Sequence, residues 1–185
     1  VMGFIRQKKA EVEERGLPEE PGWFDEEMGE LYDLLAVART HVHTDYRGEF
    51  DEIPEPEFPT RIAKTVSRLC AVHAMVYGRD ELNDDDFNFG LRIILDNIPT
   101  KRLHILAVIG DQWTTSSKVA NAARMPPNPT KRILDELQAL GLVERLTRGV
   151  TDGEYFDNRA DSYRLADGYK DAVFRLASVL WIDRN

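Results

Sequence analysis

Residues 115–146 have the sequence TSSKVANAARMPPNPTKRILDELQALGLVERL, and this stretch decides the fold. Thr115 or Ser116 can cap a short helix, which the prolines cannot continue because proline lacks the N–H and clashes with the preceding turn. A second helix is expected to start near Thr130. Its apolar residues fall at helical spacing: Ile133, Leu134, Leu137 and Leu140. Gly141 stands where a left-handed helix end is expected. The stretch therefore predicts two helices joined by a turn and followed by a strand.

The segments on either side extend this pattern to residues 99–166. Upstream, residues 100–109 predict a helix, and Gly110 ends it. Its buried face is expected to comprise Leu103, Ile105, Leu106 and Ile109. Downstream, a polar loop precedes a returning strand at residues 162–165. This order resembles a winged-helix domain, in which the second helix of the pair enters the DNA major groove and a β-hairpin wing touches the flanking backbone. The resemblance implies DNA binding.

Polar and basic side chains mark the candidate DNA contacts. At the start of the second helix, backbone N–H groups favour a phosphate. The side chains there are Asn128, Thr130, Lys131 and Arg132. On or beside the wing, the candidates are Arg145, Arg148 and Arg159. The alternative is that these are solvated charges on a winged helix that binds another protein, and the acidic residues Asp135 and Glu136 on the same helix keep this alternative open.

Charge is distributed unevenly along the chain. The 185 residues carry a net charge of −9, which by itself argues against nucleic acid, because phosphate neutralisation dominates that binding. Residues 99–165, however, hold ten Lys or Arg against eight Asp or Glu, a net charge of +2, so the other residues carry −11. Of the three predicted parts of the chain, the DNA-binding module is thus the only one with a net positive charge.

The acidic part, residues 1–98, is predicted to be helical. A short helix and a turn are expected within residues 1–22, followed by a strongly apolar helix over residues 24–38. Residues 48–59, GEFDEIPEPEFP, are rich in proline and carboxylates and predict an extended linker.

Two further helices are expected after the linker. Thr60 is a candidate N-cap for the first of them, which stops at Gly78. Asn83 is a candidate N-cap for the second, whose first turn contains three aspartates, where negative charge suits the helix dipole.

The run PTRIAKTVSRLCAVHAMVYGRDELNDDDFNFGLRII, residues 59–94, resembles the end of the helical lid of AAA+ ATPases, particularly minichromosome-maintenance helicases and MoxR-like proteins. Archaeal members of that helicase family carry a winged helix just after the lid. The resemblance implies that Arg61 contacts nucleotide phosphates, that Arg79 is the basic residue after the lid helix and that Asn83 opens the next helix. A surface arginine at a helix start is the alternative for Arg61.

The chain departs from those ATPases in its catalytic parts. It contains no GxxxxGK[ST] loop and no strand ending in a paired acidic motif, so it is not expected to be an ATPase, or any other enzyme, by itself. The chain opens with Val1 rather than Met, which hints at a longer parent protein.

Other sites find little support in the sequence. Cys70 is the single cysteine, which excludes an internal disulfide and a cysteine-based zinc cluster, and a buried thiol is expected. His41, His43 and Asp45 alternate as metal ligands on a strand would, but no further residue completes the set. Neither a metal nor a cofactor is predicted. No signal peptide or run of eighteen apolar residues occurs, so we expect a cytoplasmic protein without a membrane partner.

The last segment, residues 167–185, predicts an amphipathic helix with Phe174 and Trp181 on its apolar side. Such a helix serves either for self-association or as core that closes the acidic helical region. The fold class predicted from the whole sequence is therefore mainly α: a lid-like helical region over 1–98, a winged helix over 99–166 and a C-terminal helix.

The leading hypothesis is a module that binds duplex DNA as the C-terminal part of a larger AAA+ ATPase, with self-association or docking to an ATPase core. A protein-interaction module, with the winged helix as scaffold and the acidic half docking a basic partner, is one alternative. A self-contained transcription regulator is the other.

Overall fold

The computed structural model describes residues 2–44, 50–52, 55–147 and 161–182. The fold is mainly helical, with one three-stranded and one two-stranded antiparallel sheet among the described residues. The chain divides into two compact units, one formed by Val1–Asp33 and Phe58–Asp96 and the other by Leu34–Glu57 and Asn97–Asn185. No helix in the described part of the chain is long and apolar enough to cross a membrane.

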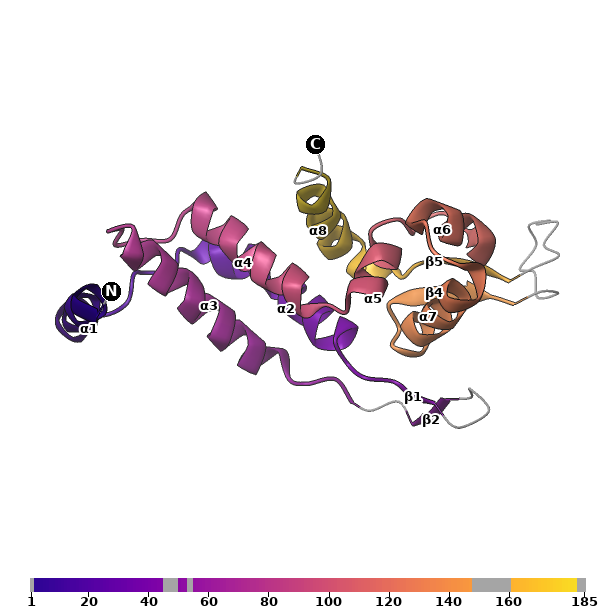
Figure 1. Ribbon diagram of the computed structural model, residues 1–185, viewed down its shortest axis with the longest axis horizontal. Helices are drawn as coiled ribbons and strands as arrows, with labels where there is room; N and C mark the ends of the chain where they lie inside the picture. The colour runs from indigo at the N-terminus through magenta and orange to yellow at the C-terminus, as the bar shows by residue number, and fades with distance from the viewer. Residues whose placement is uncertain (1, 45–49, 53–54, 148–160, 183–185) are drawn as a thin grey trace. The chain divides into compact units, whose positions relative to one another are not determined.

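The first unit is helical, and three of its helices pack together (Figure 1). Its helices are α1 (Met2–Arg15), α2 (Gly22–Ala38) as far as Asp33, α3 (Pro59–Val76) and α4 (Asp84–Asn97) as far as Asp96. The core consists of apolar side chains from the last three helices: Phe24, Met28, Leu31, Ile62, Val66, Leu91 and Ile94. Their helical spacing is the pattern on which the sequence-based prediction rests.

A glycine lets α4 approach α3 closely. A Cβ atom at Gly90 would lie 2.8 Å from Met28 Cε and 3.0 Å from Cys70 Sγ. Cys70 is fully buried at this contact, which confirms the predicted buried thiol. Burial raises the pKa of the Cys70 thiol to about 12, so the sulfur is protonated at neutral pH.

The two helix starts in this unit differ from each other. Helix α3 begins at Pro59 with Phe58 in the N-cap position, so the prediction that Thr60 caps the helix is wrong. Proline suits a first helical position because its missing N–H would have no partner there. The prediction for α4 is confirmed, since Asn83 Oδ1 accepts hydrogen bonds from the N–H groups of Asp85 (3.0 Å) and Asp86 (3.4 Å).

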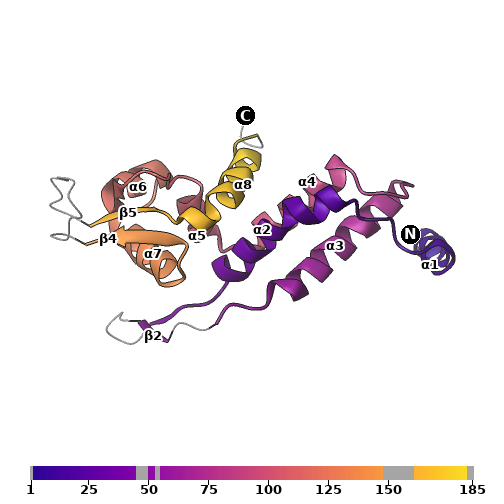
Figure 2. The ribbon, with the colours of Figure 1, turned by 180° about the vertical axis from the view of Figure 1, so that it is seen from behind.

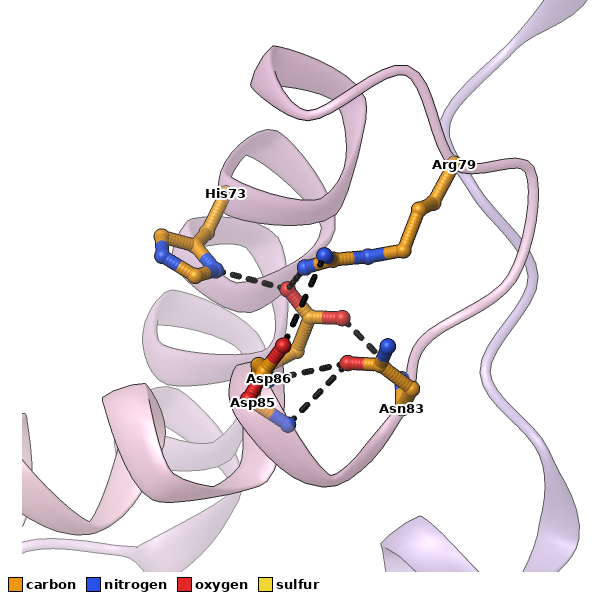
Figure 3. A network of polar contacts seen from close by, with 5 residues as sticks. All are labelled: His73, Arg79, Asn83, Asp85 and Asp86. Atoms are coloured by element: carbon orange, nitrogen blue, oxygen red, sulfur yellow. Dashed lines mark hydrogen bonds and ion pairs between the residues drawn. The ribbon is translucent and has the colours of Figure 1, made fainter.

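Asp86 completes the α4 cap with a fully buried carboxylate (Figure 3). It accepts a hydrogen bond from the Asn83 N–H at 3.0 Å, one from Arg79 Nη2 at 2.6 Å, and lies 2.7 Å from His73 Nδ1. Burial alone would raise the pKa of this carboxyl, but the hydrogen bonds from His73, Asn83 and Arg79 lower it overall. The charged form of Asp86 therefore holds the end of α3 to the start of α4.

The second unit contains a helix-strand-helix-helix-strand-strand series. Its elements are α5 (Thr100–Leu106), β3 (Thr114–Thr115), α6 (Ser116–Ala123), α7 (Pro127–Ala139), β4 (Val143–Leu146) and β5 (Ser162–Leu165). Strand β5 lies between β3 and β4, antiparallel to both, and Figure 2 shows β4 and β5 side by side. This order and pairing make a winged helix, as predicted. The two-residue strand β3 was not anticipated.

The C-terminal end of α7 follows the prediction. Gly141 has a φ of 75°, its N–H donates to the Gln138 carbonyl at 3.0 Å, and the Leu142 N–H donates to the Leu137 carbonyl at 2.9 Å. These are the two hydrogen bonds of a Schellman motif, in which glycine adopts the left-handed conformation without a Cβ clash.

A 3-10 turn, η1 (Asp167–Tyr169), leads into the C-terminal helix α8 (Lys170–Ile182). Val173 and Leu176 are buried and line a small apolar gap together with Leu103 and Leu106 of α5. The buried face of α8 therefore belongs to the core of the second unit. Phe174 is 47% exposed. Self-association through α8 stays a prediction, and the side chain of Trp181 lies outside the described residues.

The described part of the predicted linker contains a short paired strand, and its last residue, Pro59, begins α3. Strand β1 (His43–Thr44) pairs with β2 (Phe50–Glu52), which lies inside the predicted linker. The rings of His41 and His43 meet edge to face with centroids 4.6 Å apart. The described residues contain no group of three metal-ligating side chains, and Asp45 lies outside them.

Candidate nucleic-acid interface

The turn between α6 and α7 positions the candidate DNA-binding helix. Arg124 adopts the left-handed conformation with a φ of 54° and ends α6, and the Met125 N–H donates to the Ala120 carbonyl at 2.9 Å. Helix α7 then begins at Pro127, so the predicted start near Thr130 is wrong. Prolines are tolerated in the first helical turn because their N–H groups would have no carbonyl partner there.

Asn128, Lys131 and Arg132 are exposed on the first two turns of α7. Lys131 forms no ion pair among the described residues. Arg132 Nε lies 3.6 Å from Glu136 Oε1 one turn further along, and its side chain is 65% exposed. A pair at this spacing on a helix contributes about 0.5 kcal/mol, and the exposed guanidinium of Arg132 remains accessible to a phosphate.

Thr130 does not belong to this exposed set. It is fully buried, and its hydroxyl donates to the Pro126 carbonyl at 2.9 Å. The prediction that the Thr130 side chain contacts DNA is therefore corrected to a packing and hydrogen-bonding role in the first turn of α7. Helix α7 starts three residues earlier than expected, so Thr130 lies within it, three and four residues before the buried Ile133 and Leu134 and therefore on the same face.

Arg145 lies at the base of the wing with two carboxylate partners. Its Nη1 is 3.3 Å from Asp135 Oδ1, its Nη2 forms a close ion pair with Asp161, and its guanidinium lies 5.9 Å from the centre of the Tyr163 ring. Burial alone would lower its pKa, but Asp161, Tyr163 and Asp135 raise it overall. Arg145 therefore links α7 to both wing strands, and its charge is already neutralised.

The two remaining wing candidates, Arg148 and Arg159, lie outside the described residues. Their predicted contact with phosphates stays a prediction. Arg164 on β5 has the same kinds of partner as Arg145, a carboxylate and an aromatic ring. It pairs with Glu144 at 2.7 Å, and its guanidinium lies 4.8 Å from the centre of the Trp113 ring.

Two exposed cations on α6 and the turn were not among the candidates. Lys118 lies on the solvent side of α6, and Arg124 occupies the turn itself. Like Lys131, neither forms an ion pair among the described residues. The spacing of Val119 and Ala120, which are buried, indicates that Lys118 faces outward. No feature of the sequence predicts the left-handed conformation of Arg124.

A buried arginine holds α7 against the rest of the unit. Arg102 on α5 is 6% exposed, and its Nη1 donates to the carbonyls of Ala38 (2.9 Å) and Thr40 (2.5 Å). Its Nη2 donates to Glu136 Oε2 at 3.2 Å. Since Glu136 also pairs with Arg132, this network connects the core of the unit to the exposed face of α7.

Arg61, the predicted nucleotide sensor, lies in the other unit. It is exposed in the first turn of α3, where its N–H donates to the Phe58 carbonyl at 3.2 Å. The described residues hold no nucleotide-binding loop for it to complete, and its predicted role stays a prediction.

Comparison with known proteins assigns no family to the chain. No protein-family model matches it, and no curated protein matches it. Among solved structures, it is similar to ZitR of Lactococcus lactis, with 19% identity and a TM-score of 0.37 over 46% of this chain and 54% of that one. It is also similar to RV1404 of Mycobacterium tuberculosis, with 17% identity and a TM-score of 0.39 over 72% and 82%. Because both TM-scores are low, the identification of the winged helix rests on the element order and the strand pairing of this chain, not on these two structures.

Proposed function

We propose that this chain binds duplex DNA through α6, the turn and α7, with Lys118, Arg124, Lys131 and Arg132 as phosphate contacts and Asn128 at the groove. The observation that carries the proposal is that Lys118, Arg124 and Lys131 are exposed on consecutive parts of a helix-turn-helix and have no carboxylate partner among the described residues. Cations in this state release counterions from DNA without first breaking an ion pair.

The described base of the wing is expected to contribute less than the sequence predicts. Arg145 and Arg164 are committed to carboxylates and to aromatic rings, so a phosphate would have to compete with these partners. Affinity is therefore expected to depend on α6 and α7 more than on the base of the wing.

A binding assay with matched variants tests the proposal. The anisotropy of a fluorescein-labelled duplex of mixed sequence is measured against protein concentration at several salt concentrations. Lys131→Ala should weaken binding to duplexes of every sequence and lower the slope of log affinity against log salt by about 1. Lys101→Ala is the control, because Lys101 is also exposed in the same unit but lies on α5. Equal losses in both variants, or no binding even at low salt, would contradict the proposal.

We propose that this DNA-binding module is part of a self-contained transcription regulator. The AAA+ resemblance is limited to residues 59–94, and no family model matches the chain there. Arg61→Ala should accordingly leave DNA affinity unchanged. A P-loop in the reading frame upstream of Val1 would instead support the AAA+ parent and the nucleotide-sensing role of Arg61.

A protein-interaction module is the second candidate. Asp135 and Glu136 place negative charge on the same helix as Lys131, and the residues outside 99–165 carry a net charge of −11. A chain that binds no duplex at low salt but retains a folded winged helix would favour this second function.

A further inference from the structure

Helix α3 has an apolar stripe on the face opposite its core. Leu69 (43%), Val72 (41%) and Val76 (44%) are exposed at successive helical turns, and Tyr77 follows them at 67%. The buried face of the same helix carries Ile62, Val66, Cys70 and Ala74. Single exposed apolar side chains need no explanation, but a continuous stripe along one helix is typical of a contact surface.

The charges without an ion pair among the described residues that precede and follow this stripe along the chain are opposite in sign. Lys64 and Arg68 are exposed on α3 before the stripe, and α3 contains no acidic residue. Asp80 and Asp84 are exposed after it, in the turn to α4 and in the first turn of that helix. None of these four side chains forms an ion pair among the described residues.

This pattern is complementary to itself in one orientation only. When two copies of α3 lie antiparallel about a two-fold axis near Val72, the basic end of each copy faces the acidic end of the other. Each contact then occurs twice, as in any two-fold interface. A parallel arrangement would place Lys64 and Arg68 against their own counterparts and would be repulsive.

We propose that the exposed face of α3 is the contact by which two copies of this chain associate, antiparallel, with Leu69, Val72 and Val76 at the centre. The basic pair Lys64 and Arg68 of one copy faces the acidic pair Asp80 and Asp84 of the other. This surface belongs to the first unit, whereas the proposed DNA-binding helices and the exposed Phe174 of α8 belong to the second.

Charge reversal in two separate variants tests the orientation directly. One variant carries Lys64→Glu with Arg68→Glu, and the other carries Asp80→Lys with Asp84→Lys. Each variant alone would face like charges at both ends and should sediment as a monomer at concentrations where the unaltered chain is a dimer. An equimolar mixture should restore the dimer as a heterodimer, because both ends are then complementary. All four side chains are exposed, so circular dichroism should report an unchanged fold.

Two further variants identify the surface. Val72→Glu should abolish the dimer, because it places two carboxylates together at the centre. Phe174→Glu should leave it intact, since this equally exposed apolar residue lies on α8. The proposal is overturned if the unaltered chain is monomeric at all concentrations, or if either charge-reversed variant dimerises alone. It is also overturned if the mixture stays monomeric, if Val72→Glu leaves the dimer intact, or if Phe174→Glu abolishes it.

Discussion

Each of the two units buries a charged side chain, Asp86 in the first and Arg102 in the second, but their hydrogen-bond partners lie at different distances along the sequence. Asp86 collects its partners from residues 73–83, which directly precede it, at separations of 13, 7 and 3 residues. Arg102 collects its partners from residues 38–40 and from Glu136, at separations of 64, 62 and 34 residues. The first network therefore shapes one corner between two helices, whereas the second joins three distant segments.

This difference indicates how the loss of each buried side chain would affect its unit. Loss of the Asp86 network leaves the apolar contacts between α3 and α4 in place, including the close approach at Gly90. Loss of Arg102 leaves two backbone carbonyls without this donor, reduces the partners of Glu136 to Arg132, and removes the side chain that joins the end of α2 to α7. Non-local polar contacts of this kind determine the position of the candidate DNA-binding helix.

The largest effect is expected for Arg102→Met. Removal of one partner from a buried charged network should lower the free energy of unfolding by about 3 kcal/mol, because the remaining acceptors stay desolvated. Urea unfolding followed by circular dichroism measures the change. The neighbouring exposed variant Lys101→Met should change stability by no more than about 0.5 kcal/mol. A similarly small change for Arg102→Met would remove the contrast between the two networks.

A smaller effect is expected for Asp86→Asn, of about 2 kcal/mol at neutral pH, since some hydrogen bonds survive in the amide. The pKa of Asp86 is lowered in the folded state. Its charge therefore contributes stability above the pKa of the unfolded chain, and this contribution is lost as the pH falls through the folded pKa. The stability difference between the unaltered chain and Asp86→Asn should shrink on acidification. A difference that is constant with pH would show that the carboxylate charge is unimportant.

The smallest effect on stability is expected for Gly90→Ala, a loss of about 1 kcal/mol, because the new methyl group would overlap Met28 Cε and Cys70 Sγ. Gly29→Ala in α2 is the matched control. Nothing lies within 4 Å of its added Cβ, so the higher helix propensity of alanine should raise stability by up to about 1 kcal/mol. If both substitutions stabilise the chain, packing at Gly90 does not fix α4 against α3.

The sequence predicts what is local and periodic. The Asn83 cap and the left-handed Gly141 both follow from short-range hydrogen-bond geometry, and the helices of the winged helix follow from apolar spacing. The predicted starts of α3 and α7 are wrong by two and three residues, because proline is tolerated in the first turn of a helix as well as before it.

The candidate interface is predicted less completely than the fold. Strand β3 has two residues, and its pairing with β5 depends on a partner far along the chain. The ion pairs of Arg145 depend on the alignment of β4 with β5 and α7 and leave no local signal in the sequence. The burial of Thr130, by contrast, follows from the same period as Ile133 and Leu134 once the helix is extended back to Pro127.

The salt dependence of duplex binding tests the proposed interface most directly. Log affinity is measured against log salt for the unaltered chain and for a variant carrying Lys118→Ala, Arg124→Ala and Lys131→Ala. We predict that the triple variant loses about 3 from the slope, one for each phosphate contact, while its unfolding curve is unchanged. An unchanged slope in the triple variant would contradict the assignment of α6, the turn and α7 as the DNA-binding surface.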